Sequence, residues 1–292
     1  MTFAFSSIRE GWPIKVLRIP RRLINRHRNF RTLKSNILDE YVTSKPCAQN
    51  VVDIFEDQWS SRFPLEAGDL QAGKIELFND PRMTWGLEQI GGCQGSTVLE
   101  LGPLEAGHTY MLERGGASAI TAVEANTRAF LKCLATREIL DLKHVRFLLG
   151  DFLEYLRDNE EPYDICVANG VLYHMREPAE LIYLISRTSD RAIIWTQYYD
   201  DEVISSDRSK ERYFSEKSSH DFRGFKYETH KYSYLEALDS GSFCGGTAPF
   251  ASWMYRKDIL DCLKHFGFNN IKIEFDDPLA GNGPSFCIAC TR

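Results

Sequence analysis

The stretch Thr97–Thr109, TVLELGPLEAGHT, decides the fold of this chain. It begins as a short run of β-branched and leucine residues, breaks at Gly102 into a loop, and continues into a helix. Glycine lets the backbone reverse without a Cβ clash, and the N-terminus of the following helix directs unpaired N–H groups at a ligand. The pattern therefore predicts the first strand and first turn of a nucleotide-binding α/β unit, with Glu100 at the end of the strand where ligands bind.

The glycines of this loop discriminate between nucleotides. A dinucleotide fingerprint would have glycine at positions 102, 104 and 107, whereas the chain has Gly102, Leu104 and Gly107. Because the middle glycine normally lets the backbone approach a pyrophosphate, Leu104 argues against a dinucleotide. S-adenosylmethionine (SAM) has no phosphate, and its methionine amine would pair with an acid such as Glu100. The sequence therefore favours SAM, and an NAD-dependent enzyme is an alternative.

Two further acids follow apolar runs downstream. Glu124 ends the run Ala119–Val123, about twenty residues after the loop, where such folds keep the acid that binds ribose hydroxyls. Asp151 follows the run Val145–Leu149 and can accept a hydrogen bond from an adenine amino group, with Phe152 beside it to pack on the ring. An equally simple role for Asp151 is to cap the helix that begins at Phe152.

More polar side chains follow the next predicted strand. The run YDICVANG ends at Asn169 and Gly170 and continues into VLYHMREP, which contains Tyr173 and His174. These groups would lie near the reactive methyl of the cofactor, with Asn169 as a cofactor contact. His174 has a suitable ordinary pKa for a general base and would make activity rise with pH near neutrality, with Tyr173 or Tyr199 as the less favoured base. A structural role for this histidine is the alternative.

The order of these features resembles class I SAM-dependent methyltransferases over roughly residues 90–292. GVLYH followed by Pro178 is similar to the motif of the tRNA wobble-uridine carboxymethyltransferase family and related small-molecule methyltransferases. The resemblance implies a doubly wound, Rossmann-like α/β fold with seven mostly parallel strands, the last of them antiparallel. Leu104 and Ala106 stand where the family has glycines. The residues expected to hold SAM are Glu100, Gly102, Gly107, Glu124, Asp151, Phe152 and Asn169.

We expect two regions in the chain. Residues 1–90 would form a basic, mainly helical N-terminal extension, and residues 91–292 the methyltransferase domain. After the fifth strand, residues 198–254 are an insertion that begins with a polar run and continues into aromatic and glycine-rich sequence around FCGGTAPF. We expect the polar run to be mobile and the aromatic part to form a lid over the mouth of the site. A plain structural hairpin is the alternative.

Charge is distributed unevenly along the chain. The formal net charge is −6, yet Met1–Leu38 holds nine lysine and arginine residues against one glutamate, a net +8 that leaves −14 for the remainder. Leu23, Phe30, Leu33 and Ile37 lie at helical intervals between the arginines, as in a helix that contacts RNA or an anionic membrane surface. A basic helix packed on the acidic body, or a targeting peptide, is the alternative. The acidic body disfavours a nucleic-acid substrate.

The composition, 43% hydrophobic and 26% charged, is ordinary for a soluble enzyme. No apolar run approaches the roughly 18 residues of a membrane span, so we expect a soluble, cytoplasmic protein. The eight cysteines are scattered, as buried thiols in a reducing compartment would be. Cys287 and Cys290 form a CxxC inside a predicted strand, whose alternation would send them to opposite faces. We therefore expect neither a disulfide framework nor a metal site.

Together these observations predict a methyltransferase that moves the methyl group of SAM to a small-molecule acceptor by in-line displacement. A tRNA-modifying methyl- or carboxymethyltransferase is one alternative. Another is a SAM-binding regulatory module without activity, because a fold alone does not establish a reaction.

Overall fold

The computed structural model describes residues 37–240 and 243–292, so the basic arm Met1–Leu38 lies almost wholly outside the described residues. Seven strands form one sheet in the order β3-β2-β1-β4-β5-β10-β9. All are parallel except β10, which runs antiparallel to both of its neighbours. This confirms the predicted Rossmann-like sheet. The strands are β1 Thr97–Leu101, β2 Ala119–Glu124, β3 Val145–Leu149, β4 Ile165–Val167, β5 Arg191–Gln197, β9 Asn270–Asp277 and β10 Ser285–Thr291.

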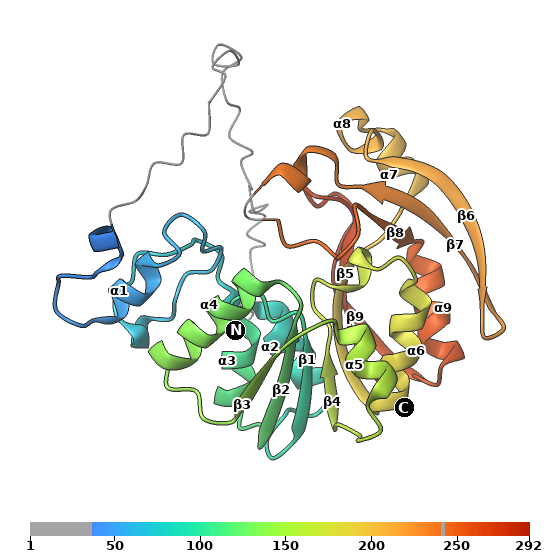
Figure 1. Ribbon diagram of the computed structural model, residues 1–292. Helices are drawn as coiled ribbons and strands as arrows, with labels where there is room; N and C mark the ends of the chain where they lie inside the picture. Colours follow the sequence, from blue (N-terminus) through green and yellow to red (C-terminus); the bar gives the residue numbers. More distant parts are fainter. Residues whose placement is uncertain (1–36, 241–242) are drawn as a thin grey trace, which may run out of the picture.

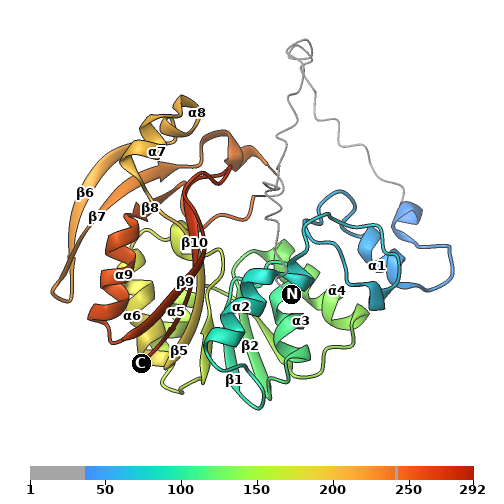
Figure 2. The same cartoon turned by 180° about the vertical axis from the view of Figure 1, so that it is seen from behind.

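Helices cover both faces of this sheet (Figure 1). One layer packs on one face, as seen from behind in Figure 2, and consists of α2 Pro81–Gln89, α3 Gly107–Arg114 and α4 Thr127–Ile139. The opposite layer consists of α5 Phe152–Asp158, α6 Pro178–Thr188 and α9 Arg256–His265. Strand alternation divides the core between the two layers: Cys287 packs in one cluster and Cys290 in the other, as predicted.

The chain before β1 packs against the α2–α3–α4 side of the sheet. It contains short helices joined by irregular backbone, namely η1 Ile37–Glu40, α1 Ala48–Asp53, η2 Leu65–Ala67 and η3 Leu77–Asn79, before α2. An aromatic series holds the segment together, with ring centroids 5.1 Å apart for Trp59 and Phe63 and 5.2 Å apart for Phe63 and Phe78. Phe78 continues the series to Tyr110 of α3. The segment is therefore fixed to the helix that follows the first loop.

The insertion after β5 folds into a second, antiparallel sheet of order β6-β7-β8. Its elements are α7 Asp201–Ser205, α8 Arg208–Glu211, β6 Phe214–Phe222, β7 Phe225–Ser233, η5 Leu235–Asp239 and β8 Phe250–Met254. The expectation of a mobile polar run is wrong, because that run forms α7, α8 and β6. Strand β6 pairs with β7 along its length. The two ends of the insertion meet where the Tyr199 N–H donates to the Met254 carbonyl at 2.8 Å.

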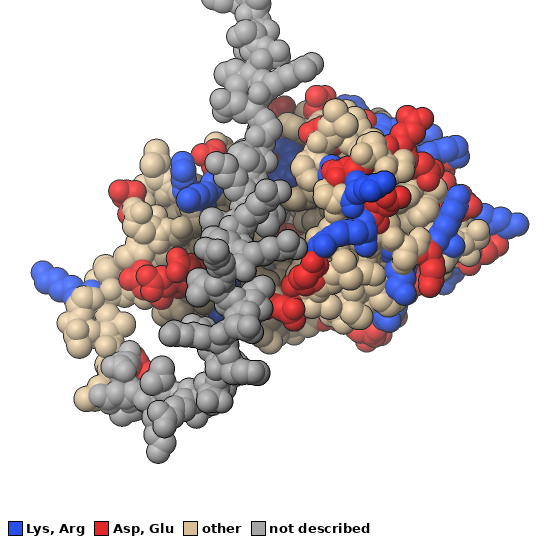
Figure 3. Space-filling view, turned by 90° about the horizontal axis from the view of Figure 1, so that it is seen from above, with Lys and Arg blue, Asp and Glu red and all other residues tan. Residues whose placement is uncertain are grey.

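Among the described residues, no helix is long and apolar enough to cross a membrane. Seen from above, lysine and arginine side chains are interspersed with aspartate and glutamate side chains on the described part of the surface (Figure 3). This face therefore offers a polyanion no broad stretch of positive charge in its described part.

Candidate active site

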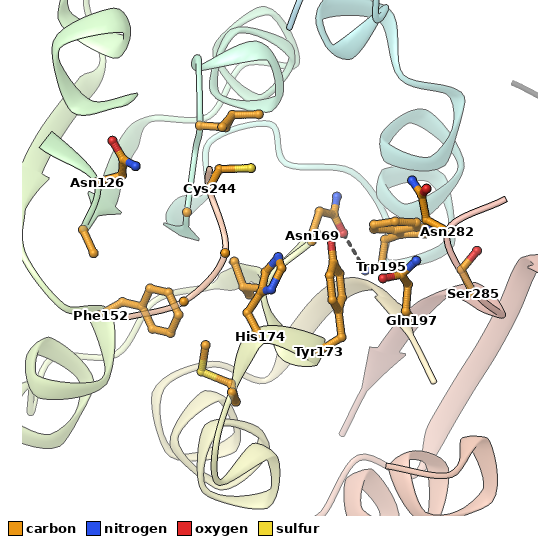
Figure 4. A pocket seen from close by; sticks show the side chains of 18 of the residues that line it. Asn126, Phe152, Asn169, Tyr173, His174, Trp195, Gln197, Cys244, Asn282 and Ser285 are labelled. Carbon is orange, nitrogen blue, oxygen red and sulfur yellow. Dashed lines mark hydrogen bonds between the residues drawn. The ribbon is translucent and has the colours of Figure 1, made fainter. Parts of the chain in front are cut away.

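A cavity of about 1990 Å³ lies at the carboxyl ends of β1, β2, β4 and β5. The insertion contributes to it through the loop residues 243–248 and through residues of β6, β7 and β8. Figure 4 shows Asn126 and Phe152 toward one end and Gln197 toward the other, with Tyr173 and His174 between them. Parallel sheets bind their ligands at this edge. The cavity therefore lies where the sequence placed the site.

The first loop keeps a left-handed backbone without its full set of glycines. Gly102, Leu104 and Ala106 have φ values of 67°, 56° and 65°. Non-glycine residues rarely adopt this conformation, so the surroundings must hold it. The Leu104 N–H donates to Glu124 Oε2 at 3.1 Å, and Thr136 Oγ1 donates to the Glu105 carbonyl at 3.0 Å. The left-handed backbone of this loop is thus held by hydrogen bonds to β2 and α4.

Glu105, between the two left-handed residues, anchors the N-terminal segment to this loop. Its side chain is fully buried and accepts hydrogen bonds from the Ser60 N–H at 2.9 Å and the Ser61 N–H at 2.7 Å. Lys132 of α4 pairs with the same carboxylate and also donates to the Gln58 carbonyl at 2.9 Å. One buried ion pair therefore joins the loop, α4 and the segment before β1.

Gly107 begins α3 against the η3 segment. An added Cβ at this position would lie 2.7 Å from the Leu77 Cβ and 2.8 Å from the Leu77 carbonyl carbon. Gly107 lines the cavity, but the close approach that requires glycine here is to Leu77. The packing against Leu77 therefore explains the glycine at this position.

We expect Gly107→Ala to lower the free energy of unfolding by about 1–3 kcal/mol, since the facing backbone cannot move away as a flexible side chain would. Urea denaturation checks this prediction. Gly150→Ala is the matched control, because no atom lies within 4 Å of the added Cβ. Equal stability of the two variants would contradict the prediction.

Glu124 ends β2 and lines the cavity, 8% exposed. Its Oε1 accepts from the Asn126 N–H at 2.8 Å, and its Oε2 accepts from the Leu104 N–H. Burial raises the pKa of this carboxyl group, while the backbone N–H groups act in the opposite sense. The backbone thus fixes the orientation of both oxygens, and each retains capacity to accept a ligand hydroxyl.

The position of the Glu100 side chain differs from the prediction that it would contact the cofactor. It is 2% exposed, accepts a 2.5 Å hydrogen bond from Thr109 Oγ1 of α3, and is not among the residues that line the cavity. Burial raises its pKa. The side chain packs beneath the loop because α3 encloses it, so its contact here is with the helix that follows the loop.

Asp151 and Phe152 both line the cavity. Asp151 Oδ1 accepts from the Leu153 N–H at 2.8 Å and caps α5. Its capping role leaves the second carboxylate oxygen for a ligand. Asn169 also lines the cavity, and its Oδ1 accepts from the Trp195 N–H at 2.8 Å (Figure 4). That bond fixes the side chain at the end of β4.

His174 ends the 3₁₀ turn η4 Leu172–His174, and its Nδ1 lies 2.7 Å from Tyr234 Oη of the insertion. Burial lowers the pKa of His174 to about 4, so the ring is neutral at pH 7. The expected titration near neutrality is therefore wrong. Burial raises the pKa of Tyr173, which keeps its hydroxyl protonated. Tyr199 stacks on His230, with ring centroids 3.5 Å apart, and is not among the cavity-lining residues.

A charged cluster at the start of α2 was not predicted. Asp80 is 2% exposed, caps α2, and pairs with Arg82 Nη2 at 2.6 Å and His108 Nε2 at 2.9 Å. Burial alone would raise the pKa of Asp80, but the hydrogen bonds with His108 and Arg82 outweigh it and hold the pKa far below its usual range. All three residues line the cavity. The Asp80-Pro81 pair, typical of a helix start, was the available signal.

No family model matches the chain, and no curated protein matches it in sequence. The structure is similar to the N-terminal domain of EvdMO1 with SAH (S-adenosylhomocysteine) bound, at 20% identity and a TM-score of 0.62, covering 84% of this chain and 94% of that one. The same domain solved in the presence of SAH and D-fucose gives 19% identity and a TM-score of 0.61, with the same coverage.

Two methyltransferases have lower sequence identity and lower structural similarity to this chain. A SAM-dependent methyltransferase from Mesorhizobium loti is 13% identical, with a TM-score of 0.50 over 74% of this chain and 100% of that one. The 1,6-didemethyltoxoflavin-N1-methyltransferase from Burkholderia thailandensis is 12% identical, with a TM-score of 0.50 over 74% of this chain and 78% of that one. These similarities show that the chain has the fold of class I SAM-dependent methyltransferases.

Proposed function

We propose that this chain is a SAM-dependent methyltransferase with a small-molecule acceptor. The observation that carries the proposal is Glu124, a strand-end acid that lines the cavity while the loop and the start of α4 fix its two oxygens. SAH in the structures of the EvdMO1 domain and of 1,6-didemethyltoxoflavin-N1-methyltransferase supports the cofactor. The 1,6-didemethyltoxoflavin bound to the second enzyme supports a small-molecule acceptor.

The described residues fit the parts of SAM. Glu124 would bind the ribose hydroxyls, Asp151 and Phe152 the adenine, and Asn169 would contact the cofactor beside the reaction centre. Bound SAM would supply an electrophilic methyl group on a sulfonium centre. The protein then has two tasks, to align the acceptor with that methyl group and to take the proton that the acceptor loses.

His174 is the group that would take this proton. In the tautomer whose Nδ1–H donates to Tyr234 Oη, Nε2 has the lone pair that accepts the proton of the acceptor. Because the ring is neutral at pH 7, it is ready to accept a proton without first losing one. Tyr234 acts as a positioning residue, since it contacts the histidine.

The tRNA-modifying alternative has less support. The basic arm that would contact RNA lies outside the described residues, and the remainder of the chain is acidic. On the surface in Figure 3 the charges of both signs are mixed. RNA binding depends on a continuous positive surface, so a small acceptor remains our proposal.

Glu124→Ala tests the cofactor site. We expect SAM affinity to fall roughly 10- to 150-fold, about 1.5–3 kcal/mol, which is the scale of lost hydrogen bonds to a charged group. Isothermal titration calorimetry with SAM measures the change, and titration with NAD tests the dinucleotide alternative. Glu138→Ala, an exposed position of α4, is the matched control. Unchanged affinity of the folded Glu124 variant would defeat the assignment.

A further inference from the structure

At the β5–β10 end, the cavity presents polar side chains that form no hydrogen bond with any described residue. Gln197 is 7% exposed and Ser285 is 5% exposed, and the two residues are direct partners across the β5–β10 pair. Together with Asn282 they line the cavity (Figure 4). Within residues 37–240 and 243–292, none of these three side chains has a hydrogen-bond partner. Gln197 and Ser285 are buried, whereas Asn282 is exposed, and buried polar groups favour a ligand with matching donors and acceptors.

The wall of the cavity beside these three residues contains two aromatic rings and an arginine that is paired with an aspartate. Trp195 and Tyr173 meet edge to face, with centroids 5.8 Å apart. Arg82 lies over the Trp195 ring at 4.5 Å, but its guanidinium is paired with Asp80. This part of the cavity therefore offers apolar ring surface and the amide and hydroxyl groups of Gln197, Asn282 and Ser285. The carboxylate residue Asp277, which pairs with Ser285 across β9 and β10, lines the cavity beside them.

The cavity continues along one face of the insertion sheet. Ser218 pairs with Thr229, and Lys231 pairs with Ser252, which places these four side chains on the same face. All four line the cavity. The total volume of about 1990 Å³ exceeds the usual 300–1,000 Å³ of a single small-ligand site, so there is room for an extended acceptor beside the cofactor.

We propose that the acceptor is a saccharide of more than one sugar unit. The inference rests on the proposed function and narrows its acceptor. Sugar hydroxyls both donate and accept hydrogen bonds, as amides and serine hydroxyls do, and the C–H faces of a sugar ring pack on aromatic rings. A flat aromatic acceptor would leave Gln197 and Ser285 buried without partners.

The reacting sugar lies beside Trp195 and Gln197, and the next unit lies along the polar face of the insertion sheet. In the transfer, the bond between sulfur and methyl carbon breaks and a bond from that carbon to the sugar oxygen forms. The electron pair stays on sulfur, giving SAH. The hydroxyl proton goes to His174 Nε2.

The test is calorimetry on the full chain saturated with SAH. The probes are methyl glycosides of neutral mono- and disaccharides and phenols of similar size. We expect disaccharide glycosides to bind more tightly than monosaccharide glycosides, and phenols not to bind. Gln197→Ala should weaken glycoside binding about 5- to 30-fold with SAH affinity unchanged. Gln89→Ala, an amide of α2 that does not line the cavity, should leave both affinities unchanged.

The experiment distinguishes failure of the proposed function from failure of the saccharide inference. Absence of SAH binding would overturn the proposed function itself. SAH binding together with phenol binding but no glycoside binding, or equal binding of mono- and disaccharides, would overturn only the saccharide inference. Should Gln197→Ala fail to fold, Ser285→Ala removes one hydroxyl group and is expected to weaken glycoside binding in the same direction. Unchanged glycoside affinity in a folded variant would also overturn the inference.

Discussion

Replacing His174 with asparagine is expected to lower kcat about 10²- to 10⁴-fold, the range attributed to a general base, and to leave SAM affinity unchanged. Asparagine can keep a hydrogen bond to Tyr234, but it cannot take a proton from the acceptor. Steady-state methyl transfer measures the loss, and calorimetry with SAM is the control. A folded variant that keeps its turnover would show that His174 has no part in proton transfer.

The pH profile gives a second readout of the same residue. His174 acts as a base only when neutral, and burial lowers its pKa to about 4. Activity of the unmodified protein should therefore be constant above about pH 5 and fall as the pH drops through about 4. Stability also declines in acid, because the unfolded chain binds the proton at its ordinary, higher pKa. Circular dichroism at each pH separates loss of fold from loss of the base.

Glu105→Ala is expected to lower the free energy of unfolding by about 3–5 kcal/mol, the scale of a broken buried ion pair. The change leaves the Lys132 ammonium group buried without its carboxylate and removes the acceptor of the Ser60 and Ser61 N–H groups. Guanidinium denaturation monitored by circular dichroism measures the effect. The exposed Glu88 of α2 supplies the control, Glu88→Ala, which should change stability by less than about 0.5 kcal/mol.

A double variant tests whether the unpaired buried charge causes this loss of stability. Glu105→Gln with Lys132→Met removes both charges together, so most of the stability should return, because no unpaired charge remains buried. Loss of less than about 1 kcal/mol in Glu105→Ala alone would contradict the role of this pair as an anchor.

Much of the fold could be predicted because its strands are short apolar runs that end in glycine or an acid. Val145–Leu149 before Gly150, and Ala119–Val123 before Glu124, are examples that the structure confirms. A local signal also identified the start of α5, since Asp151 caps that helix. These features depend on residues that are adjacent in the sequence, so they can be predicted from the sequence.

The features that depend on distant partners could not be predicted. β6 is exposed along most of its length and shows no apolar alternation, so its strand state depends on pairing with β7. The inward position of Glu100 is set by Thr109 of α3. The pKa of His174 is lowered by burial beside a loop about 70 residues away, in which a Cβ added at Gly246 would lie 2.8 Å from the His174 carbonyl oxygen. Residue type alone indicates none of these contacts.

The junction at which the insertion begins and ends has a consequence for the cavity. Tyr199 and Tyr255 form a backbone bridge, so the chain leaves β5 and enters α9 at adjacent points. A shorter or different segment between them could close the same junction without moving the main sheet. The half of the protein that carries Glu124 and Asp151 lies outside this segment. Replacement of this one segment would therefore change the cavity face that holds Ser218 and Lys231 and leave Gln197 and Ser285 in place.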